Sequence, residues 1–461
     1  MPLKSFDLKL STDNTEMENC SILKLPTVLL ADIIGEWLKA GDVGRLDSAC
    51  CSKKDRQMLL ELFQENELVF HTVHHKRYGR NMDARLQWII ARKVKCSGFF
   101  IGSGTHQAVA AECAIISGDH LKILEICNSS STSIANLLTA VSIRCHCLES
   151  LKVSLENTNS VNDVLASNPR LHSLDISSAK NLSLDLHSIR LTKLCLASCL
   201  LAQTSFLTKC ATLTELDLTG CTLPSETSAL DIGTYCTQLQ SLYVSDTSID
   251  DDEILHIVTH CRALTALDVS SCYGLTDTGV MHISLHGSHL QHLQIEYNDQ
   301  LSNVSLGMLA LHSTASTLTT LSIDSCCNFT ANNLPLLLDK CTKLTYLSTT
   351  IDENAQIYLR KCTHLQKLDL LNLYLEPNVC EAIAMHCGNL QILSLLYCKQ
   401  IDAENIAIIA RCCLKLHTIK VTTTNKAWTM ASPVAGTANE YRENVVVERL
   451  GSNNSNIRRR W

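Results

Sequence analysis

The sequence lacks the segments that carry a chain into or across a membrane. No apolar run approaches the length of about twenty residues that a helix needs to cross a bilayer. The first twenty residues carry charged and polar side chains throughout, which is not the pattern of a signal peptide. We therefore expect a protein of the cytoplasm or the nucleus that has no membrane partner.

The common signatures of cofactor, metal and catalytic sites are also lacking. The turn Gly102-Ser103-Gly104-Thr105 has no lysine of a phosphate loop, and Cys145-His146-Cys147 is not accompanied by a second pair of metal ligands. The net charge of −7 disfavours nucleic acid as a partner. No nucleophile and base are arranged as a catalytic pair. The sequence thus predicts no catalytic residue, no cofactor and no metal, and a protein that is not an enzyme.

What the sequence does contain is a repeat over residues 118–423. Three apolar residues recur at fixed offsets, as in Leu213-Leu216-Leu218, in about thirteen units of roughly 25 residues. The alternating part predicts a short strand, and stretches such as Asp251–His260 predict a return helix. The pattern indicates an α/β fold, a leucine-rich-repeat solenoid shaped as a horseshoe with a parallel inner sheet and outer helices. The short units beginning near Asn168 and Ser188 predict thin or 3₁₀-like return segments.

The 24 cysteines follow the repeat. Eight of them open a unit (Cys145, Cys210, Cys236, Cys261, Cys341, Cys362, Cys387 and Cys413). Five more come three residues after the last apolar residue of a strand, where Asn298 stands in one unit (Cys199, Cys221, Cys272, Cys326 and Cys398). We interpret them as small buried side chains that pack between turns, rather than as disulfides or metal ligands.

These repeats resemble the cysteine-containing subtype of leucine-rich repeat, with phrases such as Cys272-Tyr-Gly-Leu275-Thr-Asp277. That subtype is typical of F-box proteins, which are substrate receptors of SCF ubiquitin ligases in ubiquitin-dependent protein degradation. The segment Leu25–Cys50 looks like an F-box, with its Leu-Pro opening, Trp37-Leu38 and Asp42-Val43. After Cys51 it departs from the motif, because the usual tryptophan is missing.

The resemblance implies a non-catalytic substrate adaptor that docks a Skp-type adaptor and the cullin scaffold. The implied docking residues are Leu25, Pro26, Leu29, Ile33, Ile34, Trp37, Leu38 and Leu46. The alternative is a stand-alone scaffold or regulator whose N-terminal helices only cap the first repeat. The expected organisation is a disordered lead (1–22), an F-box-like module (23–63), a linker and N-terminal cap (64–117), the solenoid (118–423) and a C-terminal cap and tail (424–461).

Strand residues between the apolar ones are expected to point out of the concave face. In the central units they form an acidic set without lysine or arginine: Glu215, Asp217, Tyr243, Asp246, Asp268, Gln294, Glu296 and Asp324. Such a face favours a target protein with a basic segment, and Tyr243 offers an aromatic anchor. The alternative is a solvated acidic face with no partner.

Overall fold

The structure is a computed structural model that describes residues 57, 61, 70–71, 82–101, 107–126, 131–155, 159–180, 182–224, 229–330, 333–350, 354–399, 403–422 and 446–450. The chain divides into two compact units, which we describe separately: unit 1 comprises residues 1–153 and 159–171, and unit 2 comprises residues 154–158 and 172–461. The implied adaptor-docking residues between Leu25 and Leu46 lie outside the described residues.

Unit 1 alternates parallel strands with helices. Its strands, paired in the order of the sequence, are β1 (Phe70–His71), β2 (Cys96–Ile101), β3 (Ile123–Ile126) and β4 (Ser150–Ser154). Its helices are α4 (Met82–Arg92), α5 (Gln107–Ser117), η3 (Gly118–His120), α6 (Ser131–Arg144) and α7 (Asn159–Ser167). The ladder therefore also includes β1 and β2, which precede residue 118.

Unit 2 continues the same alternation. Its strands are β5 (Ser173–Ser177), β6 (Lys193–Cys195), β7 (Glu215–Asp217), β8 (Ser241–Tyr243), β9 (Ala266–Asp268), β10 (His292–Gln294), β11 (Thr320–Ile323), β12 (Tyr346–Thr349), β13 (Lys367–Leu371), β14 (Ile392–Leu396), β15 (Thr418–Thr422) and β16 (Val446–Leu450). Its helices are η4 (Ser205–Lys209), α8 (Leu230–Tyr235), α9 (Asp251–His260), α10 (Asp277–His286), α11 (Asn303–Leu311), α12 (Thr314–Thr317), α13 (Leu334–Lys340), α14 (Ala355–Leu359), α15 (Pro377–His386) and α16 (Ala403–Cys412).

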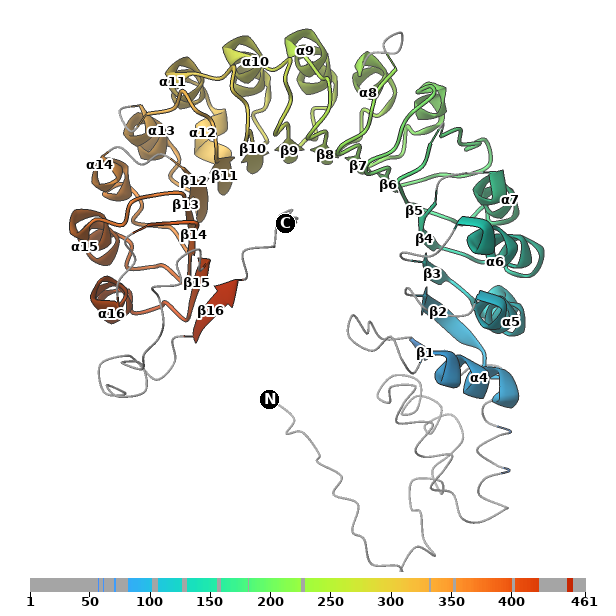
Figure 1. The fold of residues 1–461 in the computed structure, drawn as a ribbon. Coiled ribbons are helices and arrows are strands. Elements are labelled where there is room, and N and C mark those ends of the chain that lie inside the picture. Colours follow the sequence, from blue (N-terminus) through green and yellow to red (C-terminus); the bar gives the residue numbers. More distant parts are fainter. Residues whose placement is uncertain are drawn as a thin grey trace, which may run out of the picture. The chain divides into compact units, whose positions relative to one another are not determined.

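Each strand pairs in parallel with its sequence neighbours, and the helices of a unit lie on one side of its sheet (Figure 1). The repeated leucines stack in register, as in Leu216, Leu242 and Leu267, and all are buried against those helices. Because side chains alternate along a strand, the residues between the leucines lie on the side of the sheet away from the helices. We call that side of unit 2 the sheet face.

The return segments follow the length of their repeats. The short unit near Ser188 returns through η4, a 3₁₀ helix, and the described residues between β5 and β6 contain no helix. The expected helix at Asp251–His260 is α9. Asp250 caps it by accepting a hydrogen bond from Glu253 N, while the Glu253 carboxylate accepts one from Asp250 N. The expected return segments of the units near Asn168 and Ser188 and the expected helix Asp251–His260 are thus confirmed.

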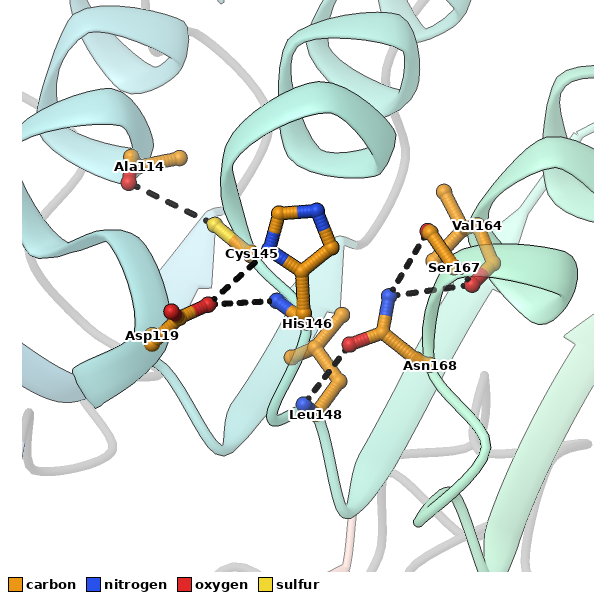
Figure 2. Close-up of polar contacts among 8 residues, drawn as sticks. All are labelled: Ala114, Asp119, Cys145, His146, Leu148, Val164, Ser167 and Asn168. Carbon is orange, nitrogen blue, oxygen red and sulfur yellow. Dashed lines mark hydrogen bonds and ion pairs between the residues drawn. The ribbon is translucent and has the colours of Figure 1, made fainter.

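The first residue of a repeat forms hydrogen bonds to a neighbouring turn, as Figure 2 shows in unit 1. The Cys145 thiol lies 3.5 Å from the carbonyl oxygen of Ala114. At the next opening position, the Asn168 amide donates to Val164 O at 3.0 Å and accepts from Leu148 N at 2.8 Å. Both side chains are buried. Cysteine and asparagine therefore share this position because each reaches a buried backbone group.

A second ladder runs along the carboxyl ends of the strands in unit 2. Thiols donate to the carbonyl of the preceding repeat: Cys272 to Val244 O at 3.2 Å, and Cys326 to Ile295 O at 3.1 Å. Asn298 takes the same place between them, donating to Val269 O at 3.0 Å and accepting from Cys272 N at 2.8 Å. The thirteen repeat cysteines named above are all free and buried, so the interpretation as packed thiols is confirmed.

Replacing Asn298 by leucine should destabilise unit 2 by about 3 kcal/mol, because it leaves a buried carbonyl and a buried N–H unsatisfied. Asn298→Cys should recover part of this loss, since a thiol can reach Val269 O but cannot accept from Cys272 N. Urea unfolding of the full chain measures both. Equal stability of the leucine and cysteine variants would contradict the role assigned to the ladder.

Candidate protein-binding face

The sheet face of unit 2 carries its side chains in three parallel rows. The first row runs Lys193, Glu215, Ser241, Ala266, His292, Thr320, Tyr346 and Lys367. The second runs Cys195, Asp217, Tyr243, Asp268, Gln294, Ser322, Ser348 and Asp369. The third lies two residues further along each strand and includes Ser270, Glu296 and Asp324. Seven of the eight predicted face residues belong to these rows.

Lysines delimit the acidic part of this face at both ends. Lys193 Nζ lies 2.7 Å from a carboxylate oxygen of Glu215, and Lys367 Nζ lies 3.6 Å from one of Asp369. From β8 to β11 the three rows contain no lysine or arginine. Carboxylates in neighbouring repeats are therefore not neutralised by a cation of these rows.

Several of the predicted residues are buried by their neighbours. Asp217, Gln294 and Asp324 are each no more than 4% exposed. Thr219 N donates to Asp217 Oδ1 at 2.9 Å, and Ser348 Oγ donates to Asp324 Oδ2 at 2.6 Å. Asp217 is thus held by the backbone of its own repeat, and Asp324 by a serine of the next repeat. Asp217 and Asp324 act within the fold, and a partner would meet other groups first.

The predicted residues that stay accessible form a smaller set. Glu215, Tyr243, Asp268 and Glu296 are half-buried. Asp246, the remaining predicted residue, is exposed and follows β8 in the left-handed region with φ +57°. Glu296 accepts a hydrogen bond from Ser322 Oγ. That these groups bind a partner remains a prediction.

Asp268 has the most perturbed carboxyl group of this face. Its pKa is raised to about 6, first by burial and then by the nearby carboxylates of Glu296 and Asp217, against the hydrogen bonds from Ser270 that favour the ionised form. Ser270 N donates to Asp268 Oδ1 at 3.0 Å. A cation bound beside Asp268 would stabilise the ionised form of this carboxyl group.

The buried thiols and acidic side chains of the described residues show no arrangement for nucleophilic or metal chemistry. Burial raises the pKa of the Cys221 and Cys326 thiols to about 12, so neither is a thiolate nucleophile at neutral pH. No three His, Cys, Asp or Glu side chains among these residues come together as metal ligands. None of the described helices combines the length and the apolar character needed to span a bilayer.

Two exposed tyrosines at the carboxyl edge of the sheet escaped the sequence analysis. Tyr273 follows β9 and is 78% exposed, and Tyr297 follows β10 and is 52% exposed. Tyr297 has φ +54°, a backbone conformation that is rare for a bulky residue. The signal in the sequence was an aromatic residue in the loop after the strand, two residues after Ile295 for Tyr297 and four residues after Val269 for Tyr273.

Comparisons with known proteins support the fold. No family model matches the chain, and no curated protein matches it by sequence. A solved complex of Rad7 and Elc1 in yeast contains a similar chain, with 18% identity over 93% of this chain and 92% of that one and a TM-score of 0.51. An internalin, InlF of Listeria monocytogenes, is 18% identical over 82% of this chain and 93% of that one, with a TM-score of 0.43. The similarity to the yeast chain agrees with a leucine-rich-repeat solenoid.

Replacing Asp268 by asparagine should stabilise the chain at neutral pH. The folded carboxyl has a raised pKa, so its ionisation costs stability above about pH 6, whereas asparagine keeps the acceptor for Ser270 N. The gain should approach about 3 kcal/mol at most at pH 7.5 and vanish near pH 4, where the unfolded carboxyl is also protonated. Urea unfolding across this pH range measures it.

The control is Glu381→Gln, which neutralises an exposed carboxylate on α15 of the same unit. Its effect should be small and should not grow as the pH rises through 6. A gain for Asp268→Asn that is independent of pH would contradict the electrostatic account.

Proposed function

We propose that this chain is a non-catalytic recognition subunit whose sheet face binds a target protein through a basic segment. The observation that carries the proposal is the acidic stretch of the sheet face, whose rows contain no lysine or arginine from β7 to β12, between Lys193 on β6 and Lys367 on β13. A face of one charge sign attracts a segment of the opposite sign and disfavours like-charged competitors. Solenoids of stacked repeats are suited to such extended binding.

The second half of the proposal concerns residues 23–63, which resemble an F-box. On that resemblance we propose that they dock a Skp-type adaptor and cullin, so that the chain presents its target to an SCF-type ubiquitin ligase. The yeast chain of the same fold is also found in a complex with a second protein, Elc1. The alternative function is a stand-alone scaffold whose N-terminal segment only covers the first repeat.

Neutralising accessible carboxylates of the sheet face tests whether this face binds a basic segment. Asp246→Asn with Glu296→Gln should weaken binding of a basic target peptide about tenfold at low salt and reduce its salt dependence, since two accessible carboxylates are removed. Asparagine tolerates the left-handed backbone at position 246, and glutamine still accepts from Ser322 Oγ. Fluorescence anisotropy at several salt concentrations measures it.

The matched control neutralises Asp252 and Glu381, which lie on helices α9 and α15. It makes the net charge less negative by the same amount, but away from the sheet face. Equal loss of affinity in the control would show that binding follows total charge and would overturn the proposed face. Asp217 and Asp324 are unsuitable for this test, because they are buried and hydrogen-bonded.

Association with a Skp-type adaptor tests the second half. The full chain should bind the adaptor, and the variant Leu25→Ala/Pro26→Ala/Ile33→Asp should lose binding, because the implied docking surface is apolar. Thr27→Ala/Lys39→Ala changes polar positions of the same segment and should bind normally. Co-purification followed by calorimetry measures the three proteins. A folded wild-type chain that does not bind would leave the stand-alone scaffold.

A further inference from the structure

Two tyrosines of unit 2 are covered by a lysine from the following repeat. Lys399 Nζ lies 4.9 Å from the ring centroid of Tyr374 and 3.1 Å from its hydroxyl. Lys367 Nζ lies 4.0 Å from the ring centroid of Tyr346. A cation over a tyrosine ring is attracted by the negative face of the ring. The spacing between repeats in this fold therefore suits a cation placed over a tyrosine of the preceding repeat.

Tyr273 occupies the same repeat position as Tyr374. Each is the fourth residue after the third of the recurring apolar residues of its repeat, namely Val269 and Leu370. In each case the residue two places earlier, Ser271 or Asn372, has a left-handed backbone, with φ +55° and +57°.

The residue at the equivalent position of the next repeat differs in charge. Lys399 stands there for Tyr374, whereas Asp299 stands there for Tyr273. Asp299 is exposed, and its Oδ1 accepts a hydrogen bond from the Cys327 thiol at 3.4 Å. Among the described residues no cation lies over Tyr273, and its exposed fraction of 78% exceeds the 43% of Tyr374. Tyr273 thus corresponds to the ring of the Tyr374–Lys399 pair, and the carboxylate of Asp299 stands in place of the lysine.

We propose that Tyr273 and Asp299 form a docking position for an arginine or lysine side chain of a basic protein segment. The side chain would lie over the Tyr273 ring, as Lys399 lies over Tyr374, while its charge pairs with Asp299. The inference rests on the proposed function and deepens it, because it places one anchor of the basic segment at the carboxyl edge of β9 and β10. Tyrosine and arginine are enriched among the residues that dominate binding energy at interfaces.

The partner is a basic protein segment rather than a small cation. Tyr297, exposed on the neighbouring repeat, and the accessible carboxylates of Asp246 and Glu296 belong to the same edge of β8 to β10. An extended segment with cationic side chains can contact several of these groups at once. A single ammonium ion would meet only one ring and one carboxylate, and both are open to solvent.

The test uses the full chain and a fluorescein-labelled peptide of alternating arginine and serine, measured by fluorescence anisotropy. Tyr273→Ala should weaken binding roughly tenfold, because the ring is lost. Asp299→Lys should weaken it at least as much, because the new lysine can cover Tyr273 as Lys399 covers Tyr374. Tyr374→Ala should leave affinity unchanged, since its ring is already occupied.

The double variant Ser248→Lys/Asp252→Asn is the matched control for charge, because it changes the net charge by +2, as Asp299→Lys does, and places its lysine at the same position of the repeat before Tyr273. It should weaken binding much less than Asp299→Lys, and equal losses would reduce the effect to general repulsion and overturn the proposal. Binding that depends on Asp246 and Glu296 but not on Tyr273 would overturn this docking position and leave the proposed function standing. No binding of the peptide to the wild-type chain would overturn both.

Discussion

The structure depends on one constraint: each repeat completes the hydrogen bonding of its neighbour. Strand amides pair with the next strand, as in a parallel sheet, but the carbonyls beyond the strands need other donors. The thiols of Cys272 and Cys326 and the amide of Asn298 supply them, each reaching back one repeat. A cysteine here costs little to bury, forms no disulfide, and has no thiolate character because burial raises its pKa. Cysteines at these positions can therefore serve the fold without being reactive thiols.

The same stacking fixes the chemistry of the sheet face. Parallel strands lie about 4.8 Å apart, so a carboxylate placed once per repeat meets its counterpart at short range. The protein manages this repulsion in two ways. Serine hydroxyls of the next repeat donate to Asp324 and Glu296, and at the ends of the face lysines pair with Glu215 and Asp369. Asp268 has no lysine on the neighbouring strands, and its pKa is raised by burial and by the carboxylates of Glu296 and Asp217.

The period of the sequence was enough to predict the strands, the short return segments and the buried cysteines, because these follow from one residue pattern. The direction of the face residues also followed from alternation. Their burial did not, because it depends on which side chain stands one repeat later: Asp324 is closed by Ser348, 24 positions away in the sequence. Tyr273 was missed for the same reason, because its proposed role depends on the charge of the residue at position 299, in the next repeat. The segment from Leu25 to Leu46 lies outside the described residues, so its role remains a prediction from resemblance.

The lysines at the two ends limit what can bind between them. Lys193 lies on β6 and Lys367 on β13, so seven steps of about 4.8 Å separate them, a span of about 34 Å that an extended chain crosses in about ten residues. A basic segment longer than this would bring its charges against Lys193 or Lys367, which are already paired with carboxylates. The face therefore favours a segment whose cationic residues lie within about ten residues of one another. It disfavours a long polybasic tail. Selectivity of this kind comes as much from the lysines that repel as from the carboxylates that attract.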